Sequence, residues 1–251
     1  MQKIQGAPLA LAGCLFILAT GVARADLKVV QTTTLTNSQY AAMRDSMTAK
    51  QRAAAHNAGM DLMMGIPQTN TIYGSGQHVR LDLGSTFVLY DTASKTQTTV
   101  NKINKTYKTI SLEDTLARPG GFQVILTPSK QHTVIVGHKA TAYNVKATSI
   151  SFPGELVTGQ VWSADDIKRP NLPSHGMLAQ FSSFLQQVKG LPLAVNLKIT
   201  GGPTGEVEFR TKVLSVSQAP LPAITFRVPA GYKPASPNAP GNPLMGMGGG
   251  F

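Results

Sequence analysis

The chain has 251 residues, of which 42% are hydrophobic and 14% are charged, and its formal net charge at pH 7 is +11. This length suffices for one domain with a sizeable hydrophobic core. The only cysteine, Cys14, lies in the apolar N-terminal segment, so a chain that loses this segment has no disulfide, no thiol nucleophile and no cysteine-ligated metal.

The first 25 residues have the pattern of an export signal. Lys3 supplies the positive charge, and residues 6–22 are uncharged. Ala23 and Ala25 form an A-x-A site for ordinary signal peptidase. We therefore predict a signal peptide over residues 1–25 and a mature protein that is periplasmic or secreted, in a Gram-negative-type bacterium.

A second processing signal overlaps the first. The sequence LAGC, which ends at Cys14, is typical of the lipobox of bacterial lipoproteins. Residues 15–18 continue the apolar run beyond Cys14, where a lipoprotein would have a polar tether, so cleavage after Ala25 is favoured. A lipoprotein anchored through Cys14 is the alternative.

The positive charge bears on the partners of the mature protein. Loss of Lys3 and Arg24 lowers the net charge by two, to +9, and the remaining basic residues are scattered. An exported chain does not meet nucleic acid. The two remaining interpretations are attraction to an anionic envelope surface and a merely well-solvated surface.

A strand at residues 27–35 precedes a segment with helical spacing at residues 38–64. Ser38 suits the N-cap position, and Gly59 and Gly65 are expected to break or end the helix. The methionines of this segment suit Cu(I) ligation, an adaptable apolar surface for a flexible ligand, or plain core packing. These methionines are Met43, Met47, Met60, Met63 and Met64.

Most of the remaining chain reads as β-structure, because short runs rich in Val, Ile, Thr and Tyr are bounded by turn residues. We predict strands at residues 79–83, 87–90, 96–103, 107–112, 134–136, 142–150, 156–162, 195–200, 207–216 and 224–228. The loop at 201–205 indicates a hairpin. Consecutive strands with short connections imply an antiparallel sheet that is strongly curved or partly closed.

A second helix is predicted at residues 173–189, where Phe181 and Phe184 belong to one apolar stripe. Gly190 fits the position after the helix end. Residues 234–251 are rich in Pro and Gly and are expected to form a disordered tail. The fold class is therefore mainly β: a single half-barrel domain over residues 26–233 with about two covering helices.

The acidic residues and histidines form no catalytic or metal-binding pattern. Neighbouring acids on exposed strands or turns are usually only solvated, and the five histidines lack the H-x-x-x-H spacing of a helical metal site. We therefore predict a protein that is not an enzyme and needs no metal or cofactor. The acidic pairs are Glu113 with Asp114, Asp165 with Asp166, and Glu206 with Glu208.

Four segments together resemble a known family. They are FVLYDTASKTQTTVNKINKTYKTISL (87–112), VGHKATAYNVKAT (136–148), GELVTGQVWSADDI (154–167), and GLPL followed later by FRVPAGYKP (226–234). The pattern resembles the exported bacterial domain of unknown function 4412 and, beyond it, the LolA- and LolB-like lipoprotein carriers. This resemblance, over about residues 27–233, implies an incomplete barrel with helices that lid an apolar cavity. It transfers no catalytic residue.

A curved sheet with one apolar face must cover that face. If the cover is incomplete, the face forms a cleft for a lipid or lipoprotein acyl chain; if it is complete, the protein is an envelope structural or interaction protein with a filled core. Ligand identity, partner and oligomeric state stay open. The predicted ligand-binding residues are Phe87, Leu89, Trp162, Phe181, Phe184, Val195, Leu197, Ile199, Phe209, Met60, Met63 and Met64.

Overall fold

The computed structural model describes residues 26–57, 61–62, 64–112, 122–150, 154–169, 187–202 and 205–236. The strands of this part are β1 (Leu27–Asn37), β2 (Gln68–Ser75), β3 (His78–Leu83), β4 (Thr86–Asp91), β5 (Thr96–Asn101), β6 (Thr106–Ser111), β7 (Phe122–Ile135), β8 (His138–Ser149), β9 (Leu156–Ala164), β10 (Leu191–Thr200), β11 (Val207–Ser217) and β12 (Lys233–Pro234). The helices are α1 (Ser38–Ser46), α2 (Ala49–Asn57) and the short 3-10 turn η2 (Ala223–Phe226).

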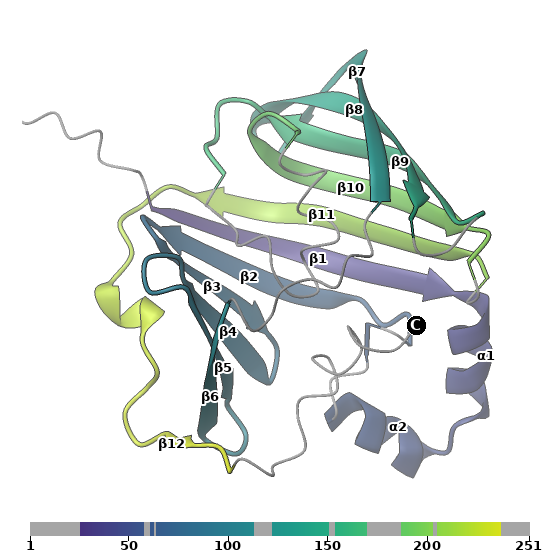
Figure 1. The fold of residues 1–251 in the computed structure, drawn as a ribbon. Helices are drawn as coiled ribbons and strands as arrows, with labels where there is room; N and C mark the ends of the chain where they lie inside the picture. Colours follow the sequence, from purple (N-terminus) through teal and green to yellow (C-terminus); the bar gives the residue numbers. More distant parts are fainter. Residues whose placement is uncertain are drawn as a thin grey trace, which may run out of the picture.

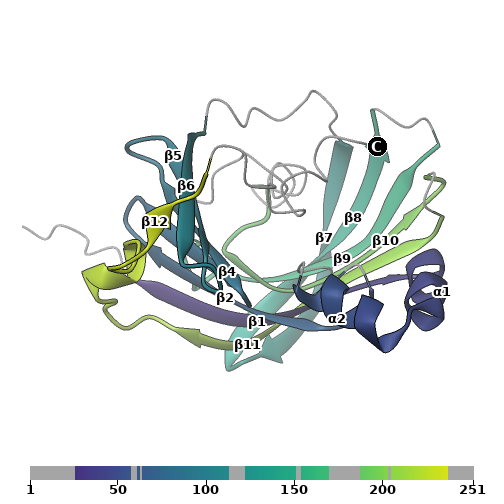
Figure 2. The same cartoon turned by 90° about the horizontal axis from the view of Figure 1, so that it is seen from below.

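All of these strands belong to one sheet, in the order β12-β6-β5-β4-β3-β2-β1-β11-β10-β9-β8-β7. Strands β1 to β6 form one antiparallel meander and strands β7 to β11 a second, and the pairing of β1 with β11 joins the two (Figure 1). The terminal strands do not pair with each other, so the sheet is open. Figure 2 shows it bent into a trough, with β1 and β11 in the floor and β4–β6 and β7–β8 in opposite walls.

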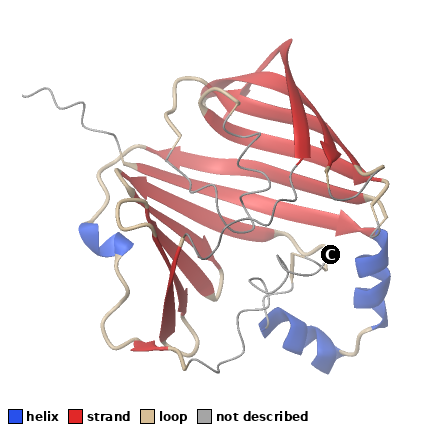
Figure 3. Ribbon diagram, in the orientation of Figure 1, coloured by secondary structure: helices blue, strands red, loops and turns tan. Residues whose placement is uncertain are grey.

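The predicted fold class is confirmed: the described chain is mainly β, with a curved antiparallel sheet and two helices (Figure 3). One strand was missed in the prediction and another was predicted too short. β2 was not predicted, because its sequence QTNTIYGS is mostly polar. β7 covers Phe122–Ile135 instead of residues 134–136, and Pro128 and a register shift interrupt its pattern.

The predicted strand at 224–228 is wrong, since residues Ala223–Phe226 form η2. Pro220 and Pro222 precede this turn and Pro229 follows it. Proline has no backbone N–H to donate to a ladder, so this apolar run cannot join the sheet as an ordinary strand.

The helical segment also differs from its prediction. Two short helices, α1 and α2, replace one helix over 38–64, and Met47 between them has extended backbone angles. Asn37, not Ser38, is the N-cap, because its Oδ1 accepts hydrogen bonds from the backbone N–H groups of Gln39 (2.8 Å) and Tyr40 (3.1 Å). None of the α1 residues is buried.

The second predicted helix, at 173–189, lies mostly outside the described residues. Of its positions only 187–189 are described, and they form a turn rather than a helix. Gly190 has φ +71°, in agreement with the left-handed position expected there. The signal peptide with Ala23, Ala25 and Cys14 lies outside the described residues.

The segment 218–236, which we call the C-terminal strap, attaches to the side of the sheet away from the trough (Figure 2). The Leu221 N–H donates to the Asp26 carboxylate at 2.6 Å. Farther on, the Lys233 N–H donates to the Lys105 carbonyl oxygen (3.0 Å) and the Ala235 N–H to that of Tyr107 (2.7 Å). The ordered chain thus extends past Pro234, where the tail was predicted to begin, and residues 237–251 lie outside the described part.

Two truncations test the role of the strap. A mature chain that ends at Ser236 should keep its melting temperature within about 2 °C, because every strap contact is retained. A chain that ends at Ser217 should melt roughly 10 °C lower, since it loses the strap's hydrogen bonds and the cover over β3 and β4. Thermal unfolding followed by circular dichroism measures both, and equal melting temperatures for the two chains would contradict a structural role for the strap.

Candidate functional site

Apolar side chains lie on the inner face of the trough in both walls and in the floor. Side chains of directly opposed residues in antiparallel strands lie on the same face of a sheet. Leu35 opposes Phe209, which opposes Leu197. On the other side, Val29 opposes Ile72. Leu35 and Val29 lie on the same face of β1 because side chains alternate along a strand.

Buried apolar clusters occupy both walls of this face. In the β8–β10 wall, Val161 and Leu197 are 0% exposed. In the β3–β4 wall, Val79, Val88 and Tyr90 pack together. Burial raises the pKa of Tyr90 to about 12, so its phenol is neutral at any physiological pH.

Between these clusters lie apolar side chains that are only half-buried. They are Leu35, Ile72, Leu81, Leu83, Ile199 and Phe209. Ile199 and Phe209 pack against the cluster that contains Leu197, and Ile72 and Leu83 against the cluster that contains Val79. We call this set of six residues the apolar band, and its side chains stay partly accessible on the inner face.

A polar pair interrupts the apolar surface on the floor of the trough. Thr33 of β1 and Asn70 of β2 are 4% and 6% exposed. The Asn70 Nδ2 group donates a hydrogen bond to Thr33 Oγ1 at 3.3 Å. The Asn70 Oδ1 atom is buried and has no hydrogen-bond partner. Asn70 lies two positions before Ile72 in β2 and so faces the inside of the trough.

The structure brings together part of the predicted ligand-binding set. Val195, Leu197, Ile199 and Phe209 lie in one cluster on the inner face. Met64 is 1% exposed, in the turn after α2. Met60, Met63, Phe181 and Phe184 lie outside the described residues. Whether any of these residues contacts a ligand stays a prediction.

Phe87 and Leu89 lie on the other face of the sheet from this cluster, not on a shared stripe. In β4 it is Thr86, Val88 and Tyr90 that point inward, and Val88 opposes Leu81. The sequence FVLY is apolar at every position, so it gives no alternation from which the inward residues could be chosen.

Trp162, another predicted ligand-binding residue, lies near the end of β9. It alternates in β9 with Val161 and Ser163, and it opposes Ala142 and Ala194. Its side chain therefore points to the other side of β9 from that of Val161. It is half-buried and packs against a third cluster, which contains Leu191 and Leu193 together with the inward Val29.

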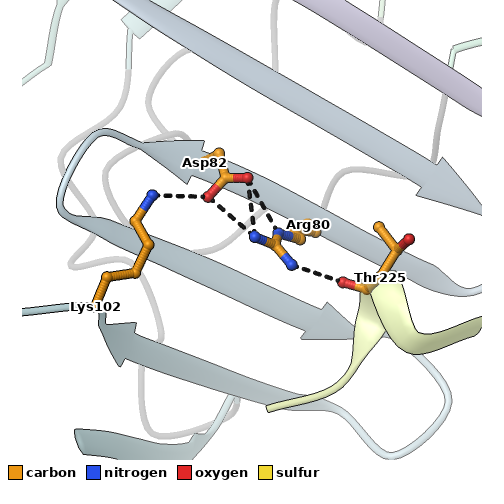
Figure 4. A network of polar contacts seen from close by, with 4 residues as sticks. All are labelled: Arg80, Asp82, Lys102 and Thr225. Carbon is orange, nitrogen blue, oxygen red and sulfur yellow. Dashed lines mark hydrogen bonds and ion pairs between the residues drawn. The ribbon is translucent and has the colours of Figure 1, made fainter. Parts of the chain in front are cut away.

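The outer face of the β2–β4 wall holds a compact polar clasp (Figure 4). The Arg80 guanidinium lies 3.9 Å from the centroid of the Phe87 ring and pairs with Asp82 at 3.0 Å. It also donates to the Thr225 carbonyl oxygen of the strap at 3.1 Å, and Lys102 pairs with Asp82 at 3.4 Å. The clasp therefore joins the strap to the sheet and covers Phe87.

The acidic residues singled out in the sequence are found in exposed pairs. Asp166 contacts His138 at 2.8 Å, Glu206 contacts Lys198 at 2.8 Å, and Arg210 contacts Glu208 at 2.7 Å. Glu113 and Asp114 lie outside the described residues. Within the described part no group of three or more His, Cys, Asp or Glu side chains is placed to hold a metal ion. In the same part, no helix is long and apolar enough to cross a membrane.

The fold and the inner face define a class of protein, a β-rich chain with one open, trough-shaped sheet and an apolar interior. Among solved structures the chain is similar to PNGF-II (TM-score 0.37, 11% identity, 80% of this chain and 29% of that one). It is also similar to a LolA superfamily protein from Nitrosomonas europaea (TM-score 0.33, 8% identity, 81% of this chain and 90% of that one). The chain thus spans less than a third of the length of PNGF-II.

No known family and no curated protein matches the sequence. The resemblance to domain of unknown function 4412 is therefore not shown by a family match. At TM-scores this low, the similarity to these structures carries no conclusion about function.

Proposed function

We propose that the protein binds or carries a hydrophobic ligand, a lipid or the acyl chain of a lipoprotein, and catalyses no reaction. The observation that supports this most is the apolar band on the inner face of the trough. Leucine, isoleucine and phenylalanine side chains are half-buried on one concave surface. An acyl chain that packs against them would remove apolar surface of both partners from water, which is favourable. The predicted export signal supports a role in the cell envelope.

A second candidate function is that of an envelope structural protein whose interior is already filled. Its supporting observation is that Val161, Leu197 and Val79, in the two walls of the trough, are at most 1% exposed. Native mass spectrometry of the protein purified from the periplasm separates the two functions. A co-purifying lipid supports the carrier, whereas a ligand-free protein that also fails to bind the fluorescent fatty acid cis-parinaric acid supports the filled core.

A substitution in the apolar band gives a sharper test. Leu81→Asn should weaken binding of cis-parinaric acid by about tenfold, because the acyl chain loses the contact area of one leucine. The matched control is Ile125→Asn in β7, where Ile125 is 64% exposed and alternates with the inward Val124 and Leu126. The control should bind like the natural protein. Equal affinities for the two variants would show that the ligand does not lie on the apolar band.

A further inference from the structure

The Thr33–Asn70 pair leaves one hydrogen-bond acceptor unused inside the trough. The amide of Asn70 is held by its Nδ2 group, which donates to Thr33 Oγ1. The Oδ1 atom of the same amide has no hydrogen-bond partner, and the residue is buried, with 6% of its surface exposed. Buried polar atoms in native proteins nearly always have a partner, and an unpaired one costs free energy. A buried acceptor without a partner, on a face that is otherwise largely apolar, indicates that a hydrogen-bond donor from a bound molecule completes the site.

We infer that Asn70 is the polar anchor of the ligand site and that the ligand is an amphiphile with a hydroxyl or amide N–H group. This inference rests on the proposed function and specifies the ligand class. The donor of the ligand bonds Asn70 Oδ1, and its alkyl chain lies over the apolar band, whose Ile72 is the next inward residue of β2. A fatty-acid anion has no proton to donate, so it lacks the group that the anchor selects.

The surroundings of Asn70 support a neutral polar group rather than a charged one. In register, Asn70 opposes Gln31 of β1, which is also uncharged and half-buried. No Lys, Arg, Asp or Glu residue lies on the inward positions of β1 or β2, which are odd-numbered in β1 and even-numbered in β2. A headgroup with a net charge would therefore be desolvated at this point without a counter-ion, which is costly.

The test compares two ligands that differ only in the donor, hexadecan-1-ol and its methyl ether. Each displaces cis-parinaric acid from the natural protein, and the alcohol should bind about tenfold more tightly, because only the alcohol can donate to Oδ1. In Asn70→Leu the alcohol should lose this advantage while the ether keeps its affinity. Asn196→Leu is the matched control, since Asn196 is an exposed asparagine of β10 on the other face; it should keep the preference for the alcohol.

Each other outcome has one meaning. Equal affinities of alcohol and ether for the natural protein overturn the anchor, with a water molecule satisfying Oδ1, but leave the proposed function standing. A preference for the alcohol that survives in Asn70→Leu overturns the anchor as well. If the alcohol, the ether and cis-parinaric acid all fail to bind, the proposed function is overturned together with the anchor. The comparison in the natural protein decides the matter even if Asn70→Leu does not fold.

Discussion

Gly159→Ala is expected to prevent the protein from folding, with a loss that exceeds about 4 kcal/mol. Gly159 lies in the middle of β9 with φ +152°, and it opposes Leu197 of β10. A Cβ atom there would overlap the Asn196 carbonyl oxygen and lie 2.9 Å from Leu197 Cα. Both are backbone atoms of the neighbouring strand, so the clash can be relieved only by separating β9 from β10.

The control for this variant is Gly84→Ala. Gly84 has φ +65° in the turn between β3 and β4, and an added Cβ would meet nothing within 4 Å. The free energy of unfolding of this variant should therefore fall by only about 1–2 kcal/mol, the cost of placing a non-glycine residue in the left-handed region. Soluble yield and circular dichroism distinguish the two. A Gly159→Ala protein that is as soluble and as stable as Gly84→Ala would contradict the close approach of β9 and β10.

Phe87→Ala should lower the free energy of unfolding by about 3–5 kcal/mol. Phe87 is 1% exposed, and its ring lies under the Arg80 guanidinium, so truncation leaves a cavity and removes a cation–π contact. Because Phe87 lies on the face away from the trough, the folded fraction should bind cis-parinaric acid with unchanged affinity. Urea unfolding measures the first quantity and titration of the folded protein the second.

Leu89→Ala is the companion variant for this prediction. Leu89 lies on the same face of β4 but is only half-buried, so its truncation should cost clearly less than that of Phe87. If Phe87→Ala instead abolished ligand binding in a protein of nearly natural stability, Phe87 would belong to the ligand site and the assignment of the two faces would be wrong.

The arrangement of strands could be predicted where hydrophobic alternation was strong. In β10 the predicted inward residues Val195 and Leu197 alternate with less buried neighbours, and the structure places both in one cluster. In β4 four successive residues are apolar, so the sequence does not show which of them point inward. The prediction chose Phe87 and Leu89, whereas Val88 and Tyr90 point inward in the structure. Which face a residue occupies follows from the register with its neighbours, and that was not readable from β4 alone.

The polar part of the site had no signal in the sequence. Asn70 belongs to a mostly polar run that was not recognised as a strand, and Thr33 is one of several threonines in β1. Their burial results from the pairing of β1 with β2 across a long connection, which no local pattern reveals. The clasp of Arg80 and the strap is likewise a contact between residues far apart in the chain.

The central claim, that the inner face of the trough holds an acyl chain, is tested most directly by paramagnetic NMR with a spin-labelled fatty alcohol. With methyl-labelled protein, we expect strong broadening of the methyl signals of Leu35, Ile72 and Leu81, which lie in the apolar band. The methyl signals of Leu89, Ile125 and Ile224, which lie on the outer face or the strap, should stay sharp. Broadening confined to the second set, or no broadening at a concentration that saturates cis-parinaric acid displacement, would contradict the claim.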